Sequence, residues 1–256
     1  MITPILTDTH CHIHDPEFFP DGGDEPYRQA RENGVERMFC VGTDTRSSQK
    51  AVEFCADKDG AFAVVGIHPH EAEKELPHID EFTEWCKGQI GDKLIGIGEI
   101  GLDYYYENSP RVRQIELLEK QIDLAVALNL PICFHVRSAF DDFWPIFDTF
   151  HGVRGVLHSF TDSLANMELG LERGLYIGVN GIATFARDRD EVTKAIPVDK
   201  ILLETDAPFL TPAPQRGKVN VPGNVALIAS YVAELRGTTV EELSRETEQN
   251  VTRLFF

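Results

Sequence analysis

Six residues with metal-binding side chains lie at or just after the ends of short apolar runs in this 256-residue chain. Four are imidazoles and two are carboxylates: His10, His12, Glu99, His135, His158 and Asp206. Imidazoles and carboxylates at the ends of successive strands are how a barrel enzyme builds a metal site. Two divalent ions would need about this many ligands, so the pattern predicts a hydrolase with a dinuclear metal centre.

The spacing of these residues indicates how they would share the two ions. Strand residues alternate between faces, so Asp8, His10 and His12 point the same way, and the two imidazoles can meet one cation. An isolated histidine pair is more often structural, so His10 and His12 indicate a metal site only together with the other four residues. Glu99 follows the apolar run "LIGIG", where an unpaired carboxylate would be costly, and one glutamate can bridge two cations. Asp206 ends the last apolar run and could orient the attacking water.

Alternating strand and helix patterns predict the scaffold. The strand-like runs are Ile5–Thr9, Val35–Val41, Phe62–Ile67, Leu94–Ile97, Pro131–His135, Gly155–His158, Leu175–Val179 and Lys200–Glu204. The helical patterns between them include Asp24–Asn33, Ser47–Lys58, Ile79–Gln89, Arg111–Leu128, Ser163–Arg173 and Val225–Leu235. Eight runs over 256 residues give 32 residues per repeat. This is the size of a βα unit and predicts a single (β/α)8 TIM barrel over residues 1–256, with the metal site at the carboxyl ends of the strands.

Local signals refine the ends of the helices. Thr239 with Glu242 three residues later is typical of a capping box at the start of the last helix. Pro110 suits the first turn of the helix that follows it. The irregular segment 211–224 comes after the eighth strand, so in a barrel it would lie over the catalytic mouth.

Composition limits the class of partner. The net charge of −18 argues against broad electrostatic binding to nucleic acid or to anionic membranes, but it allows a short nucleic-acid end held by metals and a few arginines. Five cysteines without a CxxC pair do not form a disulfide framework or a structural zinc site. No signal peptide and no run of about 18 apolar residues is visible. We therefore expect a cytoplasmic protein, and a monomer because no long apolar stripe stands out.

The sequence resembles the TatD family of metal-dependent deoxyribonucleases. The matching segments are "DTHCHIH", "VGIHPH", "GEIGLDYYY", "FHVRSAFDDFW", "GVLHSFTDS", "GLYIGVNGIATF" and "LLETDAPFLTP", which run from Asp8 to Pro212. The resemblance implies a TIM barrel of the amidohydrolase type that hydrolyses nucleic-acid phosphodiesters, typically from the 3′ end. It departs from the family pattern at Val221, where many members carry an acidic residue, and at Ser159, where cysteine is common.

The resemblance also implies roles for the ligands. Four residues would hold one metal ion: His10, His12, Glu99 and Asp206. Three would hold the second: Glu99, His135 and His158. The ions would be Mg²⁺ or Mn²⁺, and Zn²⁺ also accepts such ligands. Catalytic roles fall to Asp206 as the proton acceptor, to Glu99 as the bridge, and to His68 as a phosphate contact or leaving-group acid.

Substrate contacts are expected from four residues. Arg137 lies two residues after His135 on the same strand face, and Arg216 and Lys218 lie in the loop over the mouth, so all three could bind phosphates. Tyr104, like its neighbours Tyr105 and Tyr106, could stack on bases. Loop arginines are often only solvated, and at least one tyrosine is expected to pack beneath the loop.

Three functions compete on these observations. The leading one is a 3′–5′ exonuclease acting on single-stranded DNA ends, with DNA repair or degradation as its context. The second keeps the metal chemistry but cleaves a carbonyl bond, in a small amide or an aminoacyl-tRNA ester; relatives acting on small amides often use a modified lysine where this chain has Glu99. The third is a non-catalytic metal-binding scaffold, which would predict a gap in the ligand set, and no ligand is missing.

Overall fold

The computed structural model describes residues 4–256, and eight parallel strands organise them. They are β1 (Leu6–Cys11), β2 (Val35–Val41), β3 (Ala61–Val65), β4 (Leu94–Asp103), β5 (Ile132–Arg137), β6 (Gly155–Leu157), β7 (Tyr176–Val179) and β8 (Ile201–Leu203). Every predicted run overlaps one of these strands, and the second has the predicted bounds. Their order in the sheet, β1 to β8, follows their order in the chain.

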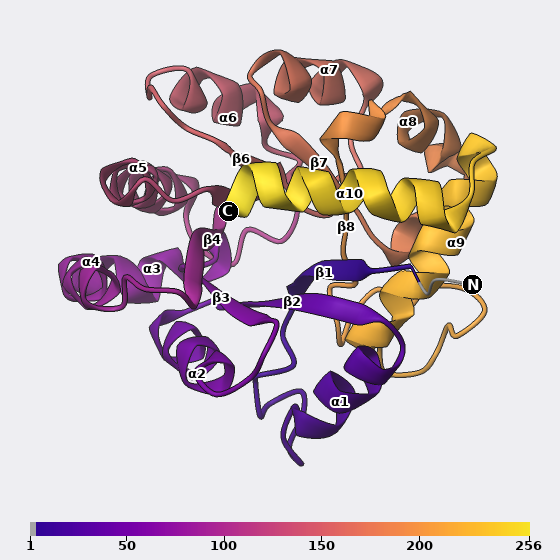
Figure 1. The fold of residues 1–256 in the computed structure, drawn as a ribbon. Coiled ribbons are helices and arrows are strands. Elements are labelled where there is room, and N and C mark those ends of the chain that lie inside the picture. The colour runs from indigo at the N-terminus through magenta and orange to yellow at the C-terminus, as the bar shows by residue number, and fades with distance from the viewer. Residues whose placement is uncertain (1–3) are drawn as a thin grey trace. The chain divides into compact units, whose positions relative to one another are not determined.

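Helices separate the strands along the chain (Figure 1). They are α1 (Asp24–Glu32), α2 (Thr45–Cys55), α3 (Ala72–Glu75), α4 (Ile79–Gly88), α5 (Arg111–Leu128), α6 (Phe140–Phe147), α7 (Leu164–Glu172), α8 (Asp190–Ala195), α9 (Val225–Arg236) and α10 (Val240–Phe255). Short 3₁₀ turns are η1 (Pro69–Glu71), η2 (Leu76–His78), η3 (Gly181–Thr184), η4 (Arg187–Arg189), η5 (Val198–Lys200) and η6 (Pro222–Asn224). In the part of the chain described, no helix is long and apolar enough to cross a membrane.

The sequence signals at the helix ends are confirmed with one adjustment. Thr239 accepts a hydrogen bond from the backbone N–H of Glu242, and the Glu242 carboxylate accepts one from Thr239, so the capping box forms. Pro110 is the N-cap of α5 and so precedes its first turn instead of lying within it. Its fixed φ and its lack of an N–H donor suit either position, so the motif alone places the start of the helix to within one residue.

The chain divides into two compact units. The first contains the residues up to Cys40 together with Ser159–Leu254 and Phe256. In it β7 pairs with β8 and β1 pairs with β2, and a bridge between Cys11 and Ala207 places β1 beside the end of β8. The first strand of the sheet therefore lies next to the last, as it does in a (β/α)8 barrel. Around these strands α8 lies next to α9 (Figure 1).

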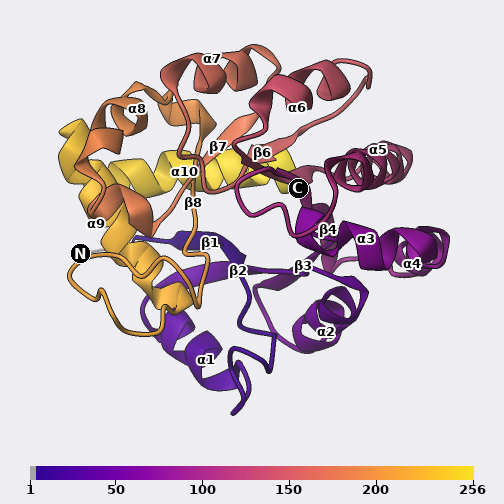
Figure 2. The same cartoon turned by 180° about the vertical axis from the view of Figure 1, so that it is seen from behind.

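The second unit contains Val41–His158 and Phe255. In it β3, β4, β5 and β6 pair in sequence, each parallel to the next. Figure 2 shows α3, α4 and α5 side by side in this unit, and both α3 and α4 contact α5. The expectation that residues 1–256 form one domain stays a prediction.

Helix α6 is not among the helical patterns named from the sequence, and it contains Pro145. Aromatic packing holds it in place: the ring of Phe134 on β5 lies 5.2 Å from that of Phe143 and 5.8 Å from that of Phe147. Buried aromatic pairs at such distances add to the free energy gained by burying the rings. This packing offsets the backbone hydrogen bond that a proline in the helix cannot donate.

Strand β4 extends six residues beyond the predicted end at Ile97, and the extension carries Glu99. Two glycines make this course of the backbone possible. Gly98 and Gly101 both have φ of +154°, and the pairing with β5 shifts register between Ile97 and Ile100. A Cβ atom on Gly101 would lie 1.7 Å from the carbonyl oxygen of His135. Glu99 therefore lies within a bulged strand and not after its end, which corrects the sequence-based placement.

We expect Gly101→Ala to lower the free energy of unfolding by at least about 2 kcal/mol, because a methyl group there meets backbone in a conformation that L-residues rarely adopt. Urea denaturation measures the change. Gly88→Ala is the matched control, since a Cβ on this glycine at the end of α4 meets nothing within 4 Å. A Gly101→Ala variant as stable as the control would contradict this account of the bulge.

Candidate metal centre

The first unit brings together three of the predicted metal ligands. His10 lies on β1, His12 follows that strand directly, and Asp206 follows β8. The two Nε2 atoms are 3.2 Å apart, and Oδ1 of Asp206 lies 3.7 Å from that of His10 and 3.4 Å from that of His12. Both imidazoles are buried, whereas the Asp206 side chain is 15% exposed. Two nitrogens and a carboxylate oxygen that converge in this way suit one divalent cation.

The junction of β1 with the end of β8 sets this geometry. The backbone N–H of Asp206 donates to the carbonyl of His10, and that of His12 donates to the carbonyl of Ala207. Beneath them the buried Asp8 carboxylate accepts hydrogen bonds from the hydroxyl of Thr205 at 2.6 Å and from its N–H at 2.8 Å. Burial outweighs these hydrogen bonds and raises the pKa of Asp8 to about 8.

The second unit gathers the other ligands around Glu99. Its Oε1 atom lies 2.7 Å from Nδ1 of His135 and 3.7 Å from Nε2 of both His68 and His158. The Glu99 carboxylate is almost fully buried, with a side chain 6% exposed. A buried carboxylate among three imidazoles needs positive charge, and a divalent cation supplies it together with the geometry that these atoms already have. The structure therefore places His135 and His158 beside Glu99, whereas their role as metal ligands stays a prediction.

Asp103, which lies on the same strand as Glu99, joins this group. Its Oδ2 accepts hydrogen bonds from Nε2 of His135 and of His70, both at 3.0 Å. Its Oδ1 accepts the backbone N–H groups of Tyr105 and Tyr106. Burial would raise the pKa of Asp103, but these donors outweigh it and hold that pKa well below its usual range.

The contact with Asp103 decides which nitrogen of His135 faces Glu99. Because Nε2 is bound to Asp103, Nδ1 remains as the ligand atom, in the carboxylate–histidine–metal arrangement. Burial lowers the pKa of His135, but its hydrogen bonds to the two carboxylates prevail and raise it to about 9. A metal ion at Nδ1 would take the place of the proton that the imidazole otherwise shares with Glu99.

His68 lies within the same group, but its tautomer gives it a different role. Its ring is the N-cap of η1, and Nδ1 accepts the backbone N–H of His70 at 3.2 Å. An accepting Nδ1 means that the single ring proton is on Nε2, which faces Glu99. Burial and the neighbouring His135 agree with this neutral form, since they hold the pKa of His68 well below its usual range. His68 therefore offers an N–H donor to the site and no free lone pair for a metal.

The predicted substrate contacts of the second unit lie on one exposed surface. The guanidinium of Arg137 lies over the rings of Tyr105 and Tyr106, at 4.2 Å and 4.7 Å from their centroids. Both of these tyrosines are exposed. Tyr104 differs from them: its hydroxyl donates to Asp142 and its ring is covered by Arg111. Tyr104 is therefore engaged with neighbouring side chains, and a contact of its ring with substrate stays a prediction.

The loop cations of the first unit are engaged locally. Arg216 donates to the carbonyl of Thr211 at 2.9 Å, and its guanidinium lies 4.0 Å from the centroid of Phe185. Lys218 donates to the side chain of Gln215. Both cations are exposed in the segment that follows β8. Their binding of phosphates stays a prediction.

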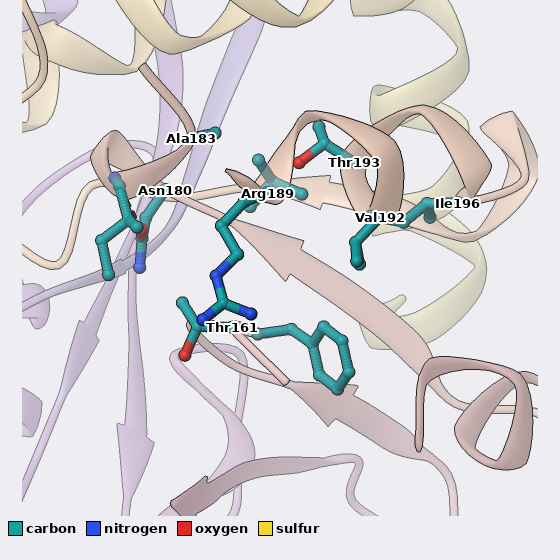
Figure 3. Close-up of a pocket in the computed structure, with 10 residues that line it drawn as sticks. Thr161, Asn180, Ala183, Arg189, Val192, Thr193 and Ile196 are labelled. Carbon is teal, nitrogen blue, oxygen red and sulfur yellow. Dashed lines mark hydrogen bonds between the residues drawn. The ribbon is translucent and has the colours of Figure 1, made fainter. Parts of the chain in front are cut away.

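A separate pocket of the first unit lies between the end of β7, η3 and α8 (Figure 3). Its lining residues are Phe160, Thr161, Val179, Asn180, Ile182, Ala183, Arg189, Val192, Thr193 and Ile196. None of them is a predicted site residue. Arg189 extends toward Thr161 in Figure 3, and its Nε lies 3.4 Å from the carboxylate of Asp188. The pocket lacks the convergent ligands of the two metal groups, so we do not assign the chemistry to it.

Comparison with known proteins identifies relatives of this chain. Residues 7–256 match the family model of TatD related DNases. The chain is 37% identical to the uncharacterized metal-dependent hydrolase YabD of Bacillus subtilis, over 98% of this chain and 99% of that protein. It is 32% identical to the 3′-5′ ssDNA/RNA exonuclease TatD of Klebsiella pneumoniae, over 91% of each. The crystal structure of YJJV, a TatD homolog from Escherichia coli, matches with a TM-score of 0.91 at 27% identity, over 99% of both chains.

These similarities define the class of the protein: a (β/α)8 barrel hydrolase that depends on metal ions. Within that class the chain belongs to the family of TatD related DNases, as the sequence motifs had indicated. Among the described residues, groups of imidazoles and carboxylates lie close enough together to hold a metal ion, and one such group is His68, Glu99 and His135.

Stability of the metal-free protein should depend on pH through Asp8. Folding raises the pKa of its carboxyl group from the ordinary 3.8 to about 8, so between these values the folded protein binds more protons than the unfolded chain. The free energy of unfolding should therefore fall as pH rises through this window, by up to about 1.4 kcal/mol per pH unit. Urea denaturation in EDTA at several pH values measures the slope. Asp8→Asn should flatten it, and equal slopes for the two proteins would exclude Asp8 as its source.

The tautomer of His68 predicts its effect on metal binding. His68→Asn keeps a side-chain acceptor at the N-cap, so the affinity for Mn²⁺ should stay within about twofold of that of the unmodified protein. His135→Asn, which removes a ligand, should lower it at least about tenfold. Isothermal titration with Mn²⁺ and elemental analysis measure both. A loss of metal in His68→Asn as large as that in His135→Asn would show that His68 is a ligand after all.

Proposed function

We propose that this protein hydrolyses the phosphodiester bonds of DNA and removes nucleotides from single-stranded 3′ ends. The observation that carries the proposal is the buried Glu99 carboxylate among three imidazoles, together with the separate group of His10, His12 and Asp206. The name of the Klebsiella relative supports the choice of substrate and polarity. DNA repair or degradation is the cellular context that we propose.

The ligands divide between two ions in this proposal. His10, His12 and Asp206 would hold one ion, His135 and His158 would hold the second, and Glu99 would be a ligand of both. Oxygen and imidazole donors of this kind accept Mg²⁺, Mn²⁺ or Zn²⁺. When bound, the ions lower the pKa of a water molecule and neutralise the charge that builds up on the phosphate.

The side chains of the protein supply the remaining steps. Asp206 is the most exposed of the three ligands in its group, so its carboxylate can orient a water molecule and accept its proton. His68 donates its Nε2–H to an oxygen of the phosphate or of the leaving group, and its neutral state keeps it a hydrogen-bond donor. Arg137, already positioned by two tyrosine rings, binds a phosphate with a planar pair of N–H groups.

A carbonyl-cleaving enzyme is the second candidate, since the same donor set can activate water against an amide or an aminoacyl ester. The stacked guanidinium of Arg137 favours the phosphodiester, because a fork of N–H donors matches phosphate oxygens. Arg216 and Lys218 would add further phosphate contacts on the loop after β8.

A labelled oligonucleotide tests the proposed function directly. Purified protein is incubated with 5′-labelled single-stranded DNA and Mg²⁺, Mn²⁺ or Zn²⁺, with EDTA as the control. We expect a ladder that shortens by one nucleotide at a time in metal and an intact strand in EDTA. Intact DNA with every metal, together with release of the amino acid from an aminoacyl-tRNA, would favour the carbonyl-cleaving alternative.

Glu99→Gln should lower kcat on this substrate by at least about two orders of magnitude, because a neutral amide cannot bridge two cations. Thermal unfolding followed by circular dichroism would verify that the variant folds. Glu75→Gln is the matched control, since Glu75 is also a buried glutamate of the second unit but binds Thr45 and Lys74 instead. A Glu99→Gln enzyme as active as the control would exclude the bridging role.

A further inference from the structure

Two exposed aromatic rings lie beside the metal group of the first unit. Phe209 is 45% exposed and Phe18 is 36% exposed, and their ring centroids are 5.0 Å apart at an interplanar angle of 77°. The Phe209 ring lies 6.3 Å from the imidazole of His12, again edge to face. The two rings therefore form an apolar surface that borders directly on a proposed metal ligand.

The backbone that carries Phe209 is held firmly. Its N–H donates to the carbonyl of Asp206 at 2.8 Å, which closes a tight turn after β8. Asn220 is fully buried, and its amide donates to the carbonyls of Phe209 and Thr205. A buried amide that binds two carbonyls fixes this turn, so the exposed ring projects from a rigid support and not from a free loop.

Phe18 lies in the segment after β1, and its N–H donates to the carbonyl of Asp15. The two strands that carry His10, His12 and Asp206 therefore also lead to the two aromatic rings. An exposed phenyl pair has no hydrogen-bonding group and no charge, so its partner must be a flat and largely apolar surface. Among the parts of a nucleotide, only the base has such a surface, because the sugar and the phosphate are polar.

We propose that Phe18 and Phe209 form a stacking subsite for a nucleobase next to the scissile phosphate. This inference rests on the proposed function and names the part of the substrate that the first unit recognises. A phenyl surface reads no hydrogen-bond pattern, so the subsite accepts all four bases and rejects a nucleotide without one. Tyr105 and Tyr106 differ from this pair, because their rings already support Arg137.

Oligonucleotides with and without a base test the subsite. The substrates are 5′-labelled single strands with a normal 3′ end or with a tetrahydrofuran abasic residue at the last or the next-to-last position. For the unmodified protein we expect kcat/KM to fall at least about tenfold when one of these two bases is removed. Phe209→Ala should show the same loss on the normal strand and no further loss on the abasic strand.

Two further measurements separate stacking from a general defect. Isothermal titration with Mn²⁺ should give Phe209→Ala and Phe18→Ala affinities within about twofold of that of the unmodified protein, because a phenyl ring is not a metal ligand. Binding in EDTA of a strand with 2-aminopurine at the sensitive position should quench its fluorescence, and the two variants should lose this quenching. Phe209→Trp should keep it. Val198→Ala is the matched control, an exposed apolar residue of the same unit in η5, before β8.

The outcomes distinguish the subsite from the proposed function. Cleavage of DNA with equal base dependence in the unmodified protein and in both alanine variants would overturn the subsite and leave the nuclease intact. A protein that leaves single-stranded DNA intact with every metal would overturn the nuclease and the subsite with it. A loss of base dependence in Phe209→Ala that is absent in Val198→Ala would establish the stacking contact.

Discussion

A buried carboxylate that faces three imidazoles is the interaction on which the second unit depends. Glu99 is removed from water, so positive charge inside the protein must balance its carboxylate. The imidazole of His135, whose Nδ1 lies 2.7 Å from Oε1 of Glu99, can supply part of that charge. The course of β4 serves this arrangement, because two glycines let the strand bulge and bring Glu99 and Asp103 to the same imidazole. A change that disturbs the bulge of β4 would therefore also move Glu99.

In the first unit, the junction of β1 and β8 brings buried polar side chains together. The backbone hydrogen bond from Asp206 to His10 brings the carboxylate to the two histidines, and Asp8 fastens the strands beneath them through Thr205. The turn that begins at Asp206 also carries Phe209. One short stretch of backbone therefore carries both a proposed metal ligand and one ring of the proposed base-stacking surface, so a change in the turn would affect both together.

Most strands and the gathering of ligands within each unit could be predicted from the sequence, because short apolar runs and the polar residues that end them are local patterns. Residues whose role depends on distant partners could not. The extension of β4 could not be predicted, because it depends on the distant carbonyl of His135, which leaves no room for a side chain at Gly101. Helix α6 forms against Phe134 despite its proline. The tautomer of His68 is set by the N–H of His70, and the support of Phe209 comes from Asn220, 11 residues away.

The acidic character of the chain explains why recognition would rely on short-range contacts. A net charge of −18 repels a polyanion, and salt screens that repulsion only beyond about 8 Å at physiological ionic strength. In the proposed function, binding would therefore come from groups that act at contact distance: metal ions at the two ligand groups, the stacked guanidinium of Arg137, and the uncharged rings of Phe18 and Phe209. Stacking of a base on such rings contributes binding energy that does not depend on charge. It therefore suits an acidic protein, which has no long-range electrostatic attraction for the phosphate backbone of DNA. Such a surface favours a single strand whose end bases are unpaired, because bases within a duplex are already stacked on each other.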